Sequence, residues 1–277
     1  MAITVNTNIP SLTAQASLST ATSKMNTAMQ RMSTGLKINS SKDDAAGLAV
    51  SNKLDYQVSS LSVAQSNAQM GASMLDTMEG VMNVINDNLT RIRDLTEQAA
   101  NGTYGSDSLS AIKTEVNARL AEINRVANSA EFNGKKLLNG STTSVNLQVG
   151  INNDANSTIT LDSSVFQNCT RAGLNLTGDV AWTSDTQAKE YLTNVDAAIK
   201  LVTNAQTAIG GRQAAITSAM EAAQVMATNL TSASSLIKDA DIAEESSNYI
   251  KQQILQQTSA SLLATANQAP SIALNLV

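Results

Sequence analysis

The residue types that most often carry out chemistry are scarce in this sequence. It contains no histidine, which removes the commonest general base and the commonest metal ligand. Its single cysteine, Cys169, has no second cysteine with which to form an internal disulfide or a thiolate metal cluster. We expect Cys169 to be a small packing residue, with a reactive thiol as the less favoured alternative. The sequence therefore predicts no catalytic site, no cofactor and no metal.

Two adjacent carboxylates, Asp43 and Asp44, could in principle act together as an acid–base pair. Their position favours a structural interpretation, because Ser41 and Asp44 have the spacing of a capping box at the beginning of a helix. Acidic side chains also stabilise the positive end of the helix dipole. We interpret the pair as a helix start.

Composition narrows the class of protein further. The formal net charge is −5, whereas binding to nucleic-acid phosphates requires a basic surface. No segment has the ~18 consecutive apolar residues of a membrane-spanning helix. The N-terminus lacks the basic start and apolar run of a Sec-type signal peptide, so we expect a cytoplasmic protein or export without a cleaved signal. Neither nucleic acid nor membrane is an expected partner.

The elements that organise the chain are long helices. Between Leu61 and Ile92, small and apolar residues recur in steps that alternate between three and four, at Leu61, Ala64, Ala68, Gly71, Leu75, Met78, Met82, Ile85, Leu89 and Ile92. This strict heptad predicts one helix over about residues 43–100, with a narrow seam against other helices. At ~1.5 Å per residue the helix would be roughly 85 Å long, so other long helices must cover it.

Four more helices follow from similar spacing. One opens at Pro10, a third helix carries apolar residues from Leu109 to Val126, and a second rod begins near Thr186. A last helix covers about residues 242–269. The turn residues after Asn101 form a short loop, so we expect the second and third helices to pack antiparallel.

The periodicity changes to two in the middle of the chain. Val145, Leu147 and Val149 alternate with polar residues, as do Ile159 and Leu161, which predicts short strands and hairpins. The expected fold class is mainly α, with long antiparallel helical rods in a coiled-coil bundle, a small β-hairpin region and terminal helices that pack on assembly. Because such helices gain most of their stability from packing, we predict that the first ~40 and last ~40 residues are disordered in the isolated protein.

Several ordered motifs resemble the terminal signatures of bacterial flagellins. They lie at residues 35–51, 132–138, 237–245, 253–257 and 266–270. The resemblance covers about residues 1–140 and 190–277, and the middle region is short for that family. It implies a subunit that polymerises into the bacterial flagellar filament for swimming motility. It also implies export by the flagellar type III apparatus, an extracellular location, and an export chaperone and a filament cap as partners.

The resemblance divides the chain into five segments. They are an N-terminal inner-core helix at 1–42, the two halves of a rod domain at 43–133 and 186–236, a short β-containing outer segment at 134–185, and a C-terminal inner-core helix at 237–277. We expect the apolar residues of the inner-core helices to contact other subunits. These residues are Leu18, Met25, Met29, Met32, Leu36, Ile250, Ile254, Leu255, Leu262 and Leu263.

A second surface is also implied by resemblance. Leu89, Arg91, Leu95 and Glu115 are similar to the patch that the innate immune receptor TLR5 reads in the flagellins it detects. The other interpretation is that the two leucines pack inside the rod and that Arg91 pairs with a charge on it. Recognition by TLR5 and packing inside the rod both remain open from the residues.

Three alternatives differ in class. An enzyme is disfavoured because only carboxylates and lysines remain as titratable groups, and they do not cluster beyond helix starts. A hook–filament junction protein shares the terminal helices, but the motifs at 132–134 and 267–270 are more similar to flagellins. A free cytoplasmic coiled coil is the third alternative.

Overall fold

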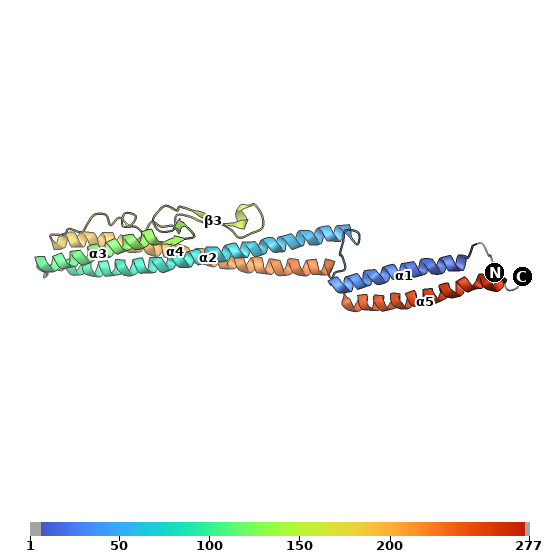
Figure 1. Cartoon of the computed structure of the whole chain (residues 1–277). Coiled ribbons are helices and arrows are strands. Elements are labelled where there is room, and N and C mark those ends of the chain that lie inside the picture. Colours follow the sequence, from blue (N-terminus) through green and yellow to red (C-terminus); the bar gives the residue numbers. More distant parts are fainter. Residues whose placement is uncertain (1–6, 275–277) are drawn as a thin grey trace. The chain divides into compact units, whose positions relative to one another are not determined.

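The computed structural model describes residues 7–274, and the chain forms two compact units. The central unit comprises residues 58–227, and the terminal unit combines residues 1–57 with residues 228–277. Two helices, α2 (Ala45–Ala99) and α4 (Asp185–Lys238), contribute residues to both units. Figure 1 shows the predominance of long helices, which confirms the predicted fold class.

Helix α2 buries every position of its predicted heptad seam. Six of its seven bulky seam residues have no exposed surface, and they are Leu75, Met78, Met82, Ile85, Leu89 and Ile92. These side chains form the centre of the core of the central unit. The seam therefore lies where the heptad spacing placed it, because a 3.5-residue repeat keeps one face of the helix toward its partners.

The start of α2 differs from the predicted capping box. The Asp44 carboxylate accepts a hydrogen bond from the Gly47 backbone N–H at 2.9 Å, so Asp44 rather than Ser41 caps the helix. Asp43 accepts hydrogen bonds from the backbone N–H groups of Asn39 and Ser40 in the preceding turn. These bonds hold residues 39–43 outside the helix, which explains why α2 begins at Ala45.

Helix α3 (Ser106–Ser129) returns along α2 in the expected antiparallel direction. Its apolar face is buried at Ile112, Val116, Leu120 and Ile123. The Arg119 guanidinium of α3 donates to the side-chain oxygen of the buried Asn88 at 3.3 Å. The loop of residues 100–105 is too short for any other packing of the two helices.

Helix α4 packs against α2 in one register along the central unit. Four side-chain hydrogen bonds cross between the helices, and the two residue numbers of each pair add to 289: Arg93–Asp196, Asn83–Gln206, Asp76–Gln213 and Gln65–Gln224. A constant sum is the signature of an antiparallel pair without slippage. We call these four contacts the α2–α4 ladder.

Two small hairpins lie beside the helices in the central unit. Strands β1 (Glu131–Phe132) and β2 (Lys135–Lys136) are joined by Asn133 and Gly134, which both have positive φ. Strands β3 (Val145–Gln148) and β4 (Thr158–Leu161) pair antiparallel, with Leu147 opposite Ile159. Leu147 packs over Gly71 of α2, where a Cβ atom would collide with the leucine side chain.

The rest of the middle region has turns in place of the expected series of strands. It still buries a set of apolar side chains against the helices, namely Leu137, Leu138, Val165, Phe166, Leu174, Leu176 and Trp182. Cys169 is fully buried among them, and its backbone N–H donates to the Leu138 carbonyl at 2.8 Å. Its role as a packing residue agrees with this position.

The terminal unit contains α1 (Ile9–Thr34) and α5 (Ile242–Leu274), which lie side by side in Figure 1. Gly35 ends α1 in the left-handed conformation, with φ of 72°. The segments that leave α1 and enter α5 are joined by backbone hydrogen bonds, including Lys37 N–H to the Lys238 carbonyl at 2.7 Å. Helix α5 continues past Pro270, which the sequence predicted as its end.

Candidate functional site: the outer face of the terminal helices

Among the side chains of α1 and α5 that the structure describes, the buried ones are small or polar. Ala21 and Ala28 of α1 are buried, and so is Ser259 of α5. Small residues let two helix backbones approach closely and leave little room between them for bulky groups. The fully buried part of the contact therefore includes none of the pair's large apolar side chains that the structure describes.

Hydrogen bonds fix the register of this helix pair. The contacts run along the whole pair: Asn8 Nδ2 to the Ala266 carbonyl, Ser11 Oγ to Asn267, Gln256 Nε2 to Thr22, Arg31 to Glu245, and Ser246 Oγ to Met32 Sδ. The two residue numbers of each contact add to between 274 and 278. The pair is therefore antiparallel and held at a defined register by polar groups.

Half of the predicted interface residues point away from this contact. Met29, Ile250, Ile254, Leu255 and Leu262 each have between 44% and 58% of their surface exposed. The other five, Leu18, Met25, Met32, Leu36 and Leu263, are half-buried. The terminal helix pair thus leaves half of these large apolar side chains exposed and buries none of the ten fully, so its apolar packing is incomplete.

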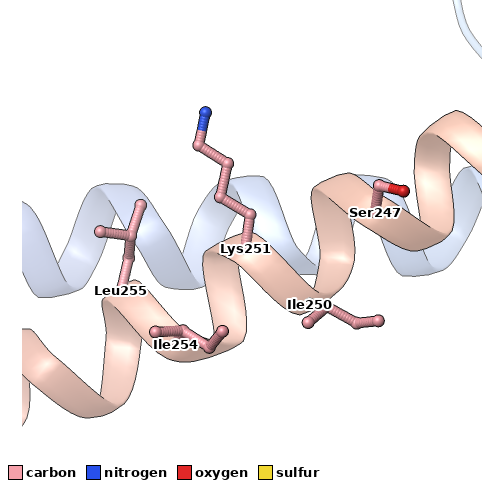
Figure 2. Close-up of a pocket in the computed structure, with 5 residues that line it drawn as sticks. All are labelled: Ser247, Ile250, Lys251, Ile254 and Leu255. Carbon is pink, nitrogen blue, oxygen red and sulfur yellow. The ribbon is translucent and has the colours of Figure 1, made fainter.

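The exposed apolar residues of α5 line an open groove with a volume of about 460 Å³. Figure 2 shows Ile250 and Ile254 on one side of α5, with Lys251 and Leu255 on another and Ser247 one turn before Lys251. Three of the five lining residues are aliphatic, and the only charge is the ammonium group of Lys251. Such a groove can bury an apolar surface of another molecule.

The residues similar to the TLR5 patch lie in two different environments. Leu89 and Leu95 are buried in the core of the central unit, with 0% and 3% exposure. Arg91 Nε donates to the Glu115 carboxylate at 3.0 Å, and both side chains are more than one third exposed. The structure brings Arg91 and Glu115 together on the surface, and it uses the two leucines for packing between helices.

The surroundings of Asp43 and Cys169, the two candidates for chemistry in the sequence, agree with structural roles. Hydrogen bonds from the Ser40 hydroxyl and from the backbone N–H groups of Ser40 and Asn39 lower the pKa of Asp43. Burial raises the pKa of the Cys169 thiol to about 12, which keeps it protonated. Among residues 7–274, no cluster of three or more potential ligands could hold a metal ion. None of the described helices is long and apolar enough to cross a membrane.

Sequence reasoning missed the polar residues that connect α1 and α5. Arg31 and Glu245, and likewise Thr22 and Gln256, lie far apart in the chain, and each looks like an ordinary surface residue alone. The signal that could have found them is the near-constant sum of residue numbers expected for an antiparallel pair. Applying it requires knowing beforehand that α1 and α5 are partners.

Comparison with known proteins agrees with this geometry. Residues 5–143 match the family model of the bacterial flagellin N-terminal helical region, and residues 192–277 match that of the bacterial flagellin C-terminal helical region. A flagellin of Xenorhabdus nematophila is 36% identical, with 100% of each chain covered. Flagellin FlaB2 of Treponema pallidum is 32% identical, with 99% of each chain covered.

A solved structure shares the fold. The structure of a putative flagellar hook-associated protein from Vibrio parahaemolyticus has a TM-score of 0.58 and 18% identity, and the match covers 70% of this chain and 99% of that one. At this identity the likeness concerns the fold alone. The two family models and the full-length relatives carry the assignment: the chain belongs to the bacterial flagellin family.

Proposed function

We propose that this chain is a structural subunit that polymerises with copies of itself into the filament of the bacterial flagellum and so serves swimming motility. The observation that carries the proposal is the outward position of Met29, Ile250, Ile254, Leu255 and Leu262 on the terminal helix pair. Family membership supports the same function, because relatives are named flagellins and flagellar filament core proteins.

The energetics favour assembly through this face. Full burial of a large aliphatic side chain contributes about 1.5–3 kcal/mol, so half-burial of one contributes about 1 kcal/mol. The five exposed side chains would together contribute on the order of 5 kcal/mol per subunit when neighbours cover them. A head-to-tail contact that does not close on itself repeats this gain for every added subunit and produces a helical filament.

Ordering of the terminal helices belongs to the same proposal. The α1–α5 contact leaves half of the large apolar side chains named above exposed, so we expect the helices to depend on neighbouring subunits for much of their apolar packing. We expect them to be disordered in the monomer and helical in the filament. Amide hydrogen exchange tests this, since strong protection from Leu18 to Leu36 in the monomer would contradict it.

The segments have matching roles in the proposed filament. Residues 1–42 and 237–277 form the inner core, residues 43–133 and 186–236 form the rod, and residues 134–185 face outward. We expect export through the flagellar type III apparatus. The proposed partners before and during assembly are a chaperone on the C-terminal helix and a filament cap. The exposed Arg91–Glu115 pair is the part of the proposed TLR5 patch that a receptor could reach on the subunit.

The direct test of the function uses growth from filament seeds. A double variant with Ile250→Ser and Ile254→Ser is expected to remain monomeric, because it removes the apolar lining of the α5 groove. Changing the exposed Gln253→Ser on the same helix is the matched control, and it should polymerise. Deleting residues 252–277 should also leave soluble monomer. Electron microscopy measures filament length in each case.

Wild-type growth distinguishes the proposal from its nearest alternative. Long filaments from wild-type protein support a filament subunit, whereas growth that stops after a few copies would indicate a junction protein. If the double serine variant grew filaments as long as those of the wild type, the terminal face would not be the assembly surface.

A further inference from the structure

The central unit has an open apolar groove that is separate from the terminal helices. Its volume is about 300 Å³, and it lies between α2 and the two hairpins. Met70 and Met74 of α2 form one side, and Val145 and Leu147 of β3 form another. Met70 is 57% exposed, although it lies in the middle of a long helix. We call this feature the hairpin groove.

Lys135 of β2 lies on the edge of the hairpin groove. Its side chain is exposed, and it forms no ion pair with any side chain that the structure describes. The neighbouring Lys136, in contrast, pairs with Glu131 at 2.7 Å. The groove therefore combines an apolar lining with one uncompensated positive charge.

A complementary projection lies on α4 of the same unit. Val225 is 61% exposed and Met226 is 48% exposed, so the helix presents two adjacent apolar side chains to solvent. Glu221 is exposed one turn before Val225 on the same side of the helix, and it has no ion-pair partner within the described part of the chain. We call these three residues the α4 projection.

Both features point away from the helices that bury the core. Met70 is two residues from the buried Ala68, and Val225 is two residues from the buried Ala223. Two residues correspond to about 200° of helix rotation, so each side chain lies opposite a buried one. Met70 and the α4 projection are therefore exposed on different helices, while the hairpins cover the neighbouring Met74, which is 4% exposed.

We infer that the α4 projection of one subunit docks into the hairpin groove of a second copy of this chain. The occupant is a second copy because its own surface carries the complement: two apolar side chains for the apolar groove, and Glu221 for Lys135. This inference rests on the proposed function, since an open filament requires two different surfaces that fit each other. It adds a contact in the central unit to the one proposed for the terminal helices.

The geometry also gives the direction of this contact. Gln65 of α2 bonds to Gln224 of α4 at 3.1 Å, so the α4 projection lies close to the level of the hairpin groove along the unit. Two surfaces at nearly the same level join copies that lie side by side. Copies stacked end to end would instead need complementary features at opposite ends of the unit.

Charge reversal provides the test. Lys135→Glu and Glu221→Lys should each lower the rate of elongation from wild-type seeds at least about tenfold, because like charges then face each other across the contact. The double variant should elongate at close to the wild-type rate. Lys200→Glu and Glu190→Lys are matched controls, because they make the same charge changes at exposed positions of α4 and should have little effect.

Cross-linking identifies the pair directly. A carbodiimide joins a lysine to a carboxylate only when the two are in contact. Filaments are grown from a mixture of ¹⁵N-labelled and unlabelled subunits. They should yield a Lys135–Glu221 cross-linked peptide pair in which one peptide is labelled and the other is not, which proves that two copies contributed.

The results separate this inference from the proposed function. If wild-type protein forms long filaments while both single reversals elongate at the wild-type rate, the docking inference is wrong and the filament function stands. Failure of the double variant to recover, when both single variants are impaired, also overturns the docking inference. If wild-type protein does not polymerise, the proposed function fails, and this inference fails with it.

Discussion

Arg31 and Glu245 form an ion pair of 2.9 Å between α1 and α5, and Glu245 is a buried carboxylate of the terminal helix pair. The Glu245 side chain is only 10% exposed, and that of Arg31 is 29% exposed. Because each residue lies in a different terminal helix, the pair holds the register in which the large apolar side chains face outward. Loss of this ion pair should therefore alter the surface that we propose for assembly.

Glu245→Gln should make filaments dissociate at lower temperature. The substitution leaves Arg31 partly buried without its counter-charge, which costs about 1–2 kcal/mol per subunit at this partial exposure. Light scattering during heating measures the dissociation. Glu244→Gln changes the same charge at an exposed neighbouring position, and it should leave the dissociation temperature unchanged. Equal effects of the two substitutions would contradict a specific role for the ion pair.

Gly71→Ala should destabilise the central unit by about 1–3 kcal/mol, because the added methyl group overpacks the contact with Leu147. Gly80 lies in the same helix, and a Cβ atom there would have nothing within 4 Å. Gly80→Ala should therefore stabilise the unit by about 0.5–1 kcal/mol through helix propensity alone. Urea unfolding of the monomer measures both values, and a stabilising Gly71→Ala would show that β3 does not pack closely on α2.

The Asp55 carboxylate should make stability depend on pH. Hydrogen bonds from Ser234 and Lys238 lower the pKa of Asp55 below its ordinary value of 3.8. A carboxylate whose pKa is lower in the folded state stabilises the protein above about pH 3.8, and this contribution is lost as the pH falls through the folded pKa. Wild type should thus be more stable than Asp55→Asn near neutral pH, and the difference should shrink in acid. A difference that stays constant from neutral to acid pH would contradict this assignment.

The Cys169 thiol should be unreactive in the folded protein. Burial raises its pKa to about 12, so almost none of it is thiolate at neutral or mildly alkaline pH. Mass spectrometry after iodoacetamide treatment should show no labelling of native protein and full labelling in denaturant. Rapid labelling under native conditions would show that the turns around Leu138 and Cys169 open easily.

The helical rods could be predicted from sequence because a heptad is a local signal. Ten seam positions between Leu61 and Ile92 specify both the helix and its buried face, and all ten are buried. The sequence of α4 is a weaker signal, because polar residues such as Gln206 and Gln213 lie on the side of the helix that faces α2. The structure explains them, because they form hydrogen bonds to Asn83 and Asp76 across the rod.

The middle region could be predicted only in part. Alternation identified β3 and β4, because a two-residue period needs only a few positions to be visible. The remaining turns bury Phe166, Leu174 and Trp182 through contacts distant in sequence, and no periodicity marks such contacts. The candidate assembly residues were identified as apolar from sequence, but their outward direction depends on the pairing of α1 with α5.

The α2–α4 ladder has a consequence for how the gene can change. Inserting one residue into either helix between two rungs would rotate the helix by about 100° and misalign the rungs on one side of the insertion. Adding residues between Ser129 and Asp185 would disturb no rung, because the insertion lies outside both α2 and α4. We therefore expect gains and losses of length among relatives to accumulate between Ser129 and Asp185, while the paired parts of α2 and α4 keep their lengths.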